Sequence, residues 1–192
     1  MADNQLVFVI HKHKATSLHY DFRLEIGGVM SSWSIPKGPT LDNTLKRLAM
    51  PTDNHDLEYR HFEGVLQEDA YDPSSPLTPK HNAPHSPVMI WDTGYYIPEI
   101  EIEKGLRKEI TNRTDGEKVM EEGLAKGEIK FFLLGKKLQG SFALVRTKGW
   151  GPKDSWLLIK HKDEYVQKDY DANDYPKSSV SGKSLEEIKK EG

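Results

Sequence analysis

The run from Leu18 to Ile26 alternates strictly between polar and apolar side chains. This period of two predicts a β-strand, because successive strand side chains point to opposite faces of a sheet. The apolar face would carry Tyr20, Phe22, Leu24 and Ile26, and the polar face would carry His19, Asp21, Arg23 and Glu25. An imidazole and a carboxylate in such a row can bind a metal, and the guanidinium beside them can bind an anion. A solvated edge strand would show the same alternation, so the rest of the chain must decide.

The remaining sequence predicts a mainly β fold. Strand-like runs occupy residues 6–10, 29–35, 64–66, 88–92, 95–102, 129–134, 142–146 and 156–160, and Gly27-Gly28 predicts a hairpin. Residues 42–47 predict one helical turn, and residues 48–63 read as largely irregular. Thr114-x-x-Glu117 predicts a capped helix that ends near Lys126. Many short strands with few helices predict a mainly β (α+β) fold, a compact antiparallel β-barrel with a few flanking short helices.

The length of 192 residues suits a single domain over residues 1–192 with a substantial core. Five of the eleven prolines fall between residues 72 and 87, which predicts a proline-rich loop. Residues 169–192 form a polar tail, in which Ser184 and Glu187 could cap a short helix.

The composition excludes several classes of chemistry. The chain has no cysteine, which rules out disulfides, Cys-ligated zinc and thiol nucleophiles. No apolar run approaches the ~18 residues of a membrane span, and the N-terminus lacks a signal pattern, so we expect a cytoplasmic protein without a membrane partner. The net charge is -3, so a polyanion would have to bind to a local basic patch.

Other residues extend the polar face of the 18–26 strand into a candidate site. If the apolar face packs under a flanking helix, we expect the polar face to look into the mouth of the barrel, where charges need partners. His13 lies across a turn from His19, and together with Asp21 these residues suit Mn, Zn or Fe. His11 is a further imidazole nearby. The set Ser32, Lys37, Arg47, His55 and Tyr59 adds groups that suit phosphoryl or phosphodiester chemistry.

Several longer motifs carry a family resemblance. They are Lys12 to Glu25, Ser32 to Pro39 (SWSIPKGP), Lys46 to Ala49, His55 to Tyr59, Gly140 to Val145 and Trp156 to Lys160. From about Phe8 onward the chain resembles the 3′-phosphoesterase domain of bacterial DNA ligase D. The resemblance implies a compact β-barrel flanked by helices. No ligase or polymerase segment fits within the chain, so it looks like a stand-alone version of the domain, as found in some archaea and bacteria.

The resemblance also implies an activity in DNA repair by non-homologous end joining. It predicts an Mn²⁺-dependent 3′-phosphoesterase, with Co²⁺ or Zn²⁺ as other candidate ions, that acts as a 3′-ribonuclease and a 3′-phosphatase. Such an enzyme removes a 3′-terminal ribonucleotide from a primer strand, leaves a 3′-phosphate, and then leaves a 3′-hydroxyl. The implied partners are nucleic acid 3′ ends in primer-template DNA and a separate DNA ligase, polymerase or Ku.

The residue match implies a role for each member of the candidate site. The metal ligands would be His13, His19 and Asp21, the phosphate contacts would be Arg23, His55, Ser32, Lys37 and Arg47, and the catalytic groups would be His55, Arg23 and Tyr59. One departure is His11, because the family commonly has Gln at this position. The roles of His11 and of the 72–87 loop stay open at this point.

Two other functions are compatible with parts of the pattern. A degenerate relative could bind DNA ends or repair partners without cleaving them, which would agree with the acidic net charge. Alternatively, His19, Asp21 and His55 could form the two-histidine, one-carboxylate triad of a non-haem iron oxygenase. The oxygenase interpretation leaves His13, Lys37 and Arg47 without a role.

Overall fold

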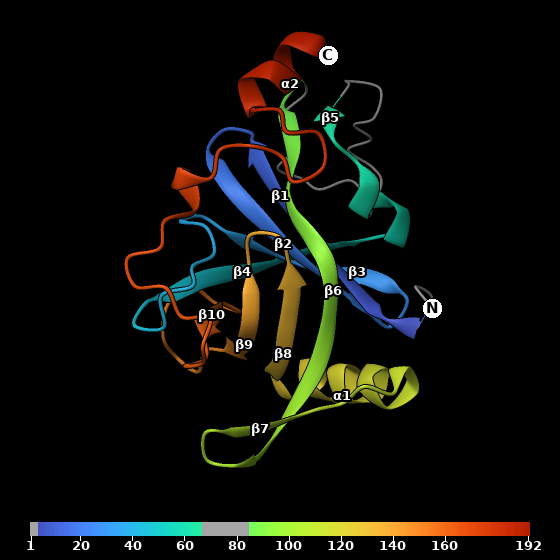
Figure 1. The fold of residues 1–192 in the computed structure, drawn as a ribbon, viewed down its shortest axis with the longest axis vertical. Helices are drawn as coiled ribbons and strands as arrows, with labels where there is room; N and C mark the ends of the chain where they lie inside the picture. Colours follow the sequence, from blue (N-terminus) through green and yellow to red (C-terminus); the bar gives the residue numbers. More distant parts are fainter. Residues whose placement is uncertain (1–3, 67–84) are drawn as a thin grey trace.

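The computed structural model describes residues 4–66 and 85–192, and its framework is an antiparallel sheet that closes on itself (Figure 1). The strands, in hydrogen-bonded order, are β1 (Leu6–Lys14), β2 (Leu18–Ile26), β3 (Val29–Ile35), β4 (Lys46–His55), β10 (Trp156–Lys160), β9 (Gln139–Arg146), β8 (Glu128–Gly135) and β6 (Pro87–Glu103). β6 also pairs with β1, which completes an eight-stranded barrel. The predicted mainly β, antiparallel barrel with short helices is confirmed.

The other elements extend or cover this barrel. The short strands β5 (Gly64–Val65) and β7 (Leu106–Glu109) pair with β6. Helix α1 (Arg113–Lys126) lies across one end of the barrel, and α2 (Leu185–Glu191) lies at the other end (Figure 1). Two 3₁₀ helices are η2 (Leu57–His61) and η4 (Ala172–Asp174). Among the described residues, no helix has the length and apolar character needed to cross a membrane.

The apolar side chains of β2 fill the interior of the barrel. The rings of Phe22 and Phe131 lie 5.8 Å apart although β2 and β8 are not neighbours in the sheet. The rings of Trp33 on β3 and Trp156 on β10 likewise meet at 5.6 Å. Contacts between strands that do not pair show that these side chains point inward.

The expected direction of the polar face is therefore wrong, because His19, Asp21 and Arg23 lie on the outer surface of the barrel. An eight-stranded barrel has an interior just wide enough for packed side chains. Each large apolar side chain that it buries contributes about 1.5–3 kcal/mol. Charges in the same place would lose their hydration without gaining partners. The apolar face consequently takes the inside and the polar face takes the outside.

The outer face around β2 is partly covered. Val9, Met30 and Ile90 form a small buried cluster on this side, and Leu57 of η2 packs against it. The 3₁₀ helix η2 therefore forms a roof over the outer faces of β1, β3 and β6. The polar side chains of β2 lie beside this roof and not on a bare surface.

Three local predictions differ from the structure. Residues 46–55 form strand β4 instead of a helical turn and irregular chain. The open stretch beyond Ala49, which β10 does not pair, carries polar residues that hide the strand pattern. Helix α1 is capped by Asn112, which precedes the predicted Thr114 box, and it ends as predicted at Gly127 in the left-handed conformation.

The two predicted irregular segments have different outcomes. Residues 72–84 of the proline-rich loop lie outside the described residues, whereas Pro87 begins β6. The polar tail includes the helix capped by Ser184, as predicted. It also buries Tyr170, Ala172 and Ile188 against the barrel core, so this segment closes one end of the barrel.

Candidate metal centre

The β1–β2 hairpin brings together the three residues predicted as metal ligands. In its register His13 is paired with His19, and His11 is paired with Asp21. One ligand atom from each of His13, His19 and Asp21 lies within 4.8 Å of the other two. His19 Nε2 and Asp21 Oδ2 are 3.3 Å apart. A directly opposed pair and a residue two positions along the same strand share one face, so the hairpin alone creates this cluster.

Neighbouring oxygens orient the two imidazoles. His19 Nδ1 donates to the Ser17 carbonyl at 3.1 Å, which leaves Nε2 facing Asp21. The Ser86 hydroxyl lies 2.7 Å from His13 Nε2. Such outer partners fix the ring orientation of metal-binding histidines. Sequence reasoning missed Ser86, because it reaches His13 only through the pairing of β1 with β6.

The electrostatics of the cluster favour a cation. Burial lowers the pKa of His13 to about 4, so its imidazole is neutral at pH 7 and can offer a lone pair. Burial would raise the pKa of Asp21, but Arg23 and His19 outweigh burial and lower it to about 2. Burial also opposes charge on His19, yet the hydrogen bond and charge of Asp21 raise its pKa. Asp21 thus favours the protonated form of His19, and a divalent ion could take the place of that positive charge.

The donor set fits a divalent transition metal. Two imidazole nitrogens and one carboxylate suit Mn²⁺, Co²⁺, Zn²⁺ or Fe²⁺ better than Mg²⁺ or Ca²⁺, which prefer oxygen ligands. Three protein ligands leave coordination positions for water or a substrate oxygen. The residues present therefore fit a divalent transition metal.

Arg23 lies next to this cluster and is fixed by three hydrogen bonds. Its Nε donates to His11 Nδ1 at 3.0 Å, one terminal nitrogen donates to Ser32 Oγ at 3.0 Å, and the other donates to Asp21 Oδ2 at 3.3 Å. The side chain is only 4% exposed. Because a guanidinium has five N–H donors, two remain for an anion. Its carbon also lies 5.1 Å from the centre of the Tyr59 ring.

His11 holds Arg23 from the other side. It is fully buried, at 0% exposure, and its Nδ1 accepts the bond from Arg23 Nε. The proton must then be on Nε2, which donates to the Phe62 carbonyl at 3.1 Å. Burial first, and the Arg23 charge second, keep the pKa of His11 well below its ordinary value. His11 is therefore a neutral positioning residue for Arg23, a role that the sequence left open.

An aromatic stack lies beside Arg23. The rings of His55 and Tyr59 are stacked at 4.3 Å, and Tyr59 stacks on Phe62 at 5.5 Å. Asp56 caps η2 by accepting from the Tyr59 backbone N–H, which places Tyr59 over Arg23. Burial, followed by the Arg23 charge, lowers the pKa of His55 to about 4, and burial raises the pKa of Tyr59. Both side chains therefore present neutral hydrogen-bond donors.

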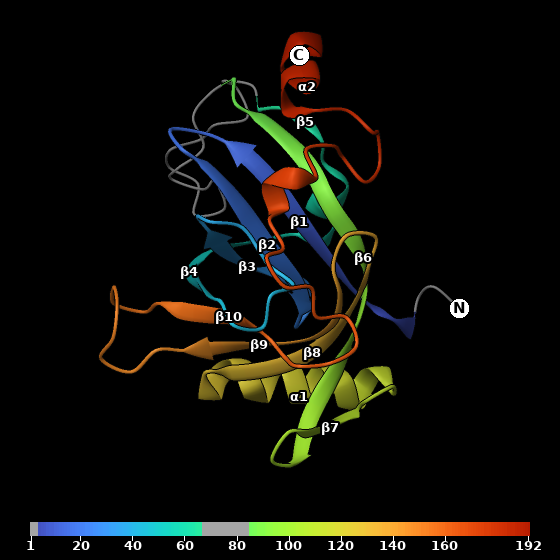
Figure 2. The ribbon, with the colours of Figure 1, turned by 60° about the vertical axis from the view of Figure 1, so that its left-hand side comes forward.

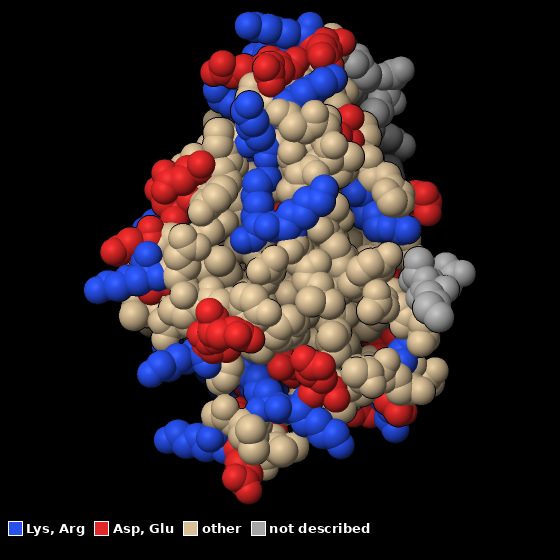
Figure 3. Space-filling model, in the orientation of Figure 1, with Lys and Arg blue, Asp and Glu red and all other residues tan. Residues whose placement is uncertain are grey.

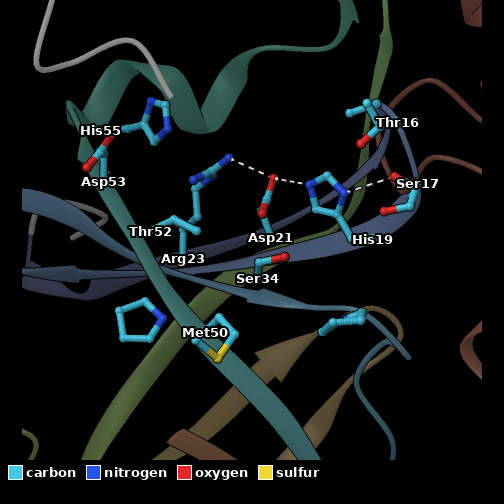
Figure 4. Close-up of a pocket in the computed structure, with 13 residues that line it drawn as sticks. Thr16, Ser17, His19, Asp21, Arg23, Ser34, Met50, Thr52, Asp53 and His55 are labelled. Atoms are coloured by element: carbon cyan, nitrogen blue, oxygen red, sulfur yellow. Dashed lines mark hydrogen bonds and ion pairs between the residues drawn. The ribbon is translucent and has the colours of Figure 1, made fainter. Parts of the chain in front are cut away.

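Of these groups, His19, Asp21, Arg23 and His55 line one pocket of about 570 Å³, whereas His13 and Tyr59 lie outside its lining (Figure 4). Figure 4 shows Asp21 between Arg23 and His19, with His55 on β4 nearby. The other labelled lining residues are Thr16, Ser17, Ser34, Met50, Thr52 and Asp53. Sequence reasoning did not identify these six residues as part of the site. Only Ser34 gave an indication, because it shares a strand face with Ser32.

Three predicted phosphate contacts lie outside the lining of this pocket. Ser32 accepts from Arg23 and so acts through it. Lys37 is exposed in the turn after β3, beside the lining residue Pro36. Arg47 is paired with Leu158, on the inward side of β4. Within the described part of the chain, its Nε has no hydrogen-bond partner. The structure therefore does not bring Lys37 or Arg47 to the metal cluster.

Comparison with known proteins identifies the family of the chain. Residues 11–146 match the family model of the DNA ligase D 3′-phosphoesterase domain. The multifunctional non-homologous end joining protein LigD of Pseudomonas aeruginosa is 37% identical over 158 residues, which is 82% of this chain and 15% of that protein. The corresponding LigD repair protein of Mycobacterium tuberculosis is 34% identical over 161 residues, or 84% of this chain and 17% of that protein.

The LigD of Mycolicibacterium smegmatis is 34% identical over 158 residues, with 82% and 17% coverage. The chain thus spans between 15% and 17% of the length of these curated relatives. The matched region includes every proposed metal ligand and phosphate contact named above. The chain therefore belongs to the DNA ligase D 3′-phosphoesterase domain family.

Proposed function

We propose that this chain is a divalent-metal-dependent phosphoesterase that processes the 3′ ends of DNA strands for end joining. The observation that carries the proposal is one pocket lined by His19, Asp21, Arg23 and His55, with His13 completing a cluster of three ligand atoms beside it. A metal beside a fixed guanidinium is an arrangement suited to a phosphate ester. Membership of a 3′-phosphoesterase family supports the same conclusion.

The residues around the pocket suggest how the reaction is assisted. A bound ion would be held by His13, His19 and Asp21, and it would neutralise charge on the phosphoryl oxygens. Arg23 would bind the same phosphate with its two remaining N–H donors. Neutral His55 would donate to a phosphate oxygen or to the leaving oxygen, and Tyr59 would support both side chains by stacking. Such catalysis acts by positioning and charge neutralisation.

The finer predictions are part of the same proposal. We propose Mn²⁺ as the working ion, with Co²⁺ and Zn²⁺ as alternatives, and successive removal of a 3′-ribonucleotide and a 3′-phosphate. Lys37 lies on the rim next to Pro36, where it could contact a longer substrate. A role for Arg47 would need its side chain to reach the pocket from the other side of β4. A separate ligase, polymerase or Ku would then act on the resulting 3′-hydroxyl.

The test uses primer-template DNA that ends in a 3′-ribonucleotide or a 3′-phosphate. After treatment with EDTA, the protein is supplied with Mn²⁺, Co²⁺ or Zn²⁺, and the products are separated by electrophoresis. We expect conversion of the first substrate to a 3′-phosphate and then to a 3′-hydroxyl, and no conversion by Asp21→Ala. DNA binding without turnover with any of the ions would instead support the non-catalytic binding module.

The oxygenase alternative has less support. The cluster of ligand atoms found among the described residues contains His13 and not His55. His55 instead stacks on Tyr59. The geometry therefore favours the phosphoesterase.

A further inference from the structure

The loop between β9 and β10 carries an aromatic side chain that the barrel does not use. Trp150 is 62% exposed, whereas the other three tryptophans, Trp33, Trp91 and Trp156, are at most 3% exposed. Among the described residues, no other ring or cation stacks on Trp150. A large ring kept in water at the tip of a loop is available for a partner.

The loop that holds Trp150 is internally braced. Thr147 donates to the Ser155 carbonyl from its backbone N–H at 2.9 Å and from its hydroxyl at 3.0 Å. Ser155 N–H donates in turn to the Pro152 carbonyl at 3.2 Å. Gly149 and Gly151 adopt positive φ values of 67° and 74° on either side of the tryptophan. The ring is therefore presented on a defined turn, which reduces the entropy lost on binding.

The charges around Trp150 point to a polyanion. Arg146, Lys148 and Lys153 lie within a few residues of it, against the single carboxylate of Asp154. Within the described chain, neither Lys148 nor Lys153 makes an ion pair or side-chain hydrogen bond. Aromatic side chains between cations are the usual platform for single-stranded nucleic acid, because every base has a face to stack.

A second pocket lies between the base of this loop and the metal pocket. This pocket, of about 350 Å³, is lined by Arg146, Asp154 and Trp156 on one side. On its other side it shares Pro51 and Thr52 with the metal pocket. It forms where β4 continues past Ala49 without pairing with β10. Figure 2 shows the β9–β10 connection projecting beyond the barrel near β4.

A further group of basic side chains lies on the face drawn in Figure 3, and part of it is already engaged. Figure 3 shows Lys and Arg side chains gathered over the upper part of that face. Two lysines of the β8–β9 turn bind backbone carbonyls: Lys136 contacts Ser179 at 2.7 Å, and Lys137 contacts Trp91 and Lys177. These charges hold the C-terminal segment in place, which leaves the β9–β10 loop as the better candidate.

We propose that the β9–β10 loop is a second binding surface for the nucleic acid strand, in which Trp150 stacks on a base and Lys148 and Lys153 contact phosphates. The single strand next to the processed 3′ end would pass from the metal pocket over β4 to this loop. The inference rests on the proposed function, because it assumes that a 3′ end occupies the metal pocket.

The kinetic test compares a long substrate with one too short to reach the loop. A 3′-phosphorylated single-stranded oligonucleotide and a nucleoside 3′-monophosphate are each assayed with Mn²⁺. Trp150→Ala should raise KM for the oligonucleotide about tenfold, leave its kcat unchanged, and leave both constants for the monophosphate unchanged. The matched control is Ile102→Ala in the β6–β7 hairpin, where the side chain is 54% exposed, and it should change neither substrate's constants.

A binding test is independent of turnover. In EDTA, an oligonucleotide ending in a 3′-hydroxyl is titrated while tryptophan fluorescence is recorded, and only Trp150 is exposed enough to be quenched by a stacked base. We expect quenching that Trp150→Ala abolishes. The double variant Lys148→Ala/Lys153→Ala should lower the salt slope of binding, by roughly 0.7 for each phosphate that the variant no longer neutralises.

The outcomes separate this inference from the phosphoesterase assignment. The role of the loop is rejected if wild-type protein turns over the oligonucleotide but shows no quenching, or if Trp150→Ala affects both substrates equally. Quenching without any turnover by the wild type would reject the phosphoesterase assignment and support a strand-binding role for the loop.

Discussion

Replacing His11 by leucine should disturb Arg23 while leaving the metal ligands intact. Leucine has a similar size but no polar atom, so Arg23 Nε and the Phe62 carbonyl would each lose their partner. Because His11 is completely buried, water cannot readily take its place. Arg23 would keep its bonds to Ser32 and Asp21, yet its plane would no longer be fixed at Nε.

The size of the effect follows from the two broken bonds. A buried polar group left without a partner costs about 1–3 kcal/mol, and more when it is charged. Two such groups, offset by about 1–2 kcal/mol from the buried apolar side chain of leucine, give a net loss of about 3 kcal/mol in the free energy of unfolding. Misplacing a donor to the transition state should lower kcat by about 10²-fold.

Glutamine provides the matched control. Its amide oxygen can accept from Arg23 and its amide N–H can donate to Phe62, which reproduces both bonds of the imidazole. His11→Gln should therefore stay within about 1 kcal/mol of wild type and lose less than about tenfold in kcat, since single hydrogen bonds contribute on that scale. The measurements are urea unfolding, steady-state kcat and KM on a 3′-phosphorylated primer, and bound Mn²⁺, which should be equal in all three proteins.

Two results would refute this reasoning. If His11→Leu kept the wild-type kcat, His11 would not set the orientation of Arg23. If the leucine and glutamine variants lost activity equally, the cause would be the shape of the ring and not its hydrogen bonds.

Three further predictions concern the metal, the pH response and helix α1. Asp21→Ala should lose bound Mn²⁺ and activity together, and elemental analysis that still finds one ion per chain would exclude Asp21 as a ligand. The pKa of His55 is lowered to about 4 from an ordinary value near 6.5, so as the pH falls the unfolded chain takes up this proton before the folded protein does. The free energy of unfolding should therefore fall as the pH drops from about 6.5 towards 4. In denaturation experiments across this range, the free energy of unfolding of His55→Gln should depend less steeply on pH than that of wild type. Gly127→Ala should lower both the melting temperature and the free energy of unfolding, the latter by about 1 kcal/mol or more. The reason is that Gly127 has a φ of 89° and that an added Cβ would lie 3.0 Å from Arg146 Cβ. An unchanged melting curve would show that the helix end adapts.

The sequence was sufficient to predict the type of fold but not which face of strand β2 points into the barrel. Alternation along β2 separates two faces, and it does not say which face a closed sheet turns inward. That choice depends on how much apolar volume the other strands also contribute. Strand β4 was missed because its last residues, which pair with β3 but not with β10, are mostly polar and show no period of two.

The site was predictable to the extent that it is local. His13, His19 and Asp21 meet because a short turn pairs their strands, and spacing along the chain reveals this. His55 reaches the site through its pairing with Met30, and Phe62 reaches it through His11. Those interactions depend on tertiary structure, which leaves no local sign in the sequence. The metal and phosphate roles of all these residues stay predictions until the variants are measured.

The locality of the β1–β2 hairpin also bears on the order in which the molecule assembles. Closing a short turn costs little entropy, whereas pairing β1 with β6 must join residues as distant as Phe8 and Gly94. The three candidate ligands are therefore complete in a segment that can form first, long before His55 and Tyr59 arrive. If these residues bind an ion, the metals available while the chain folds would therefore influence which ion is bound.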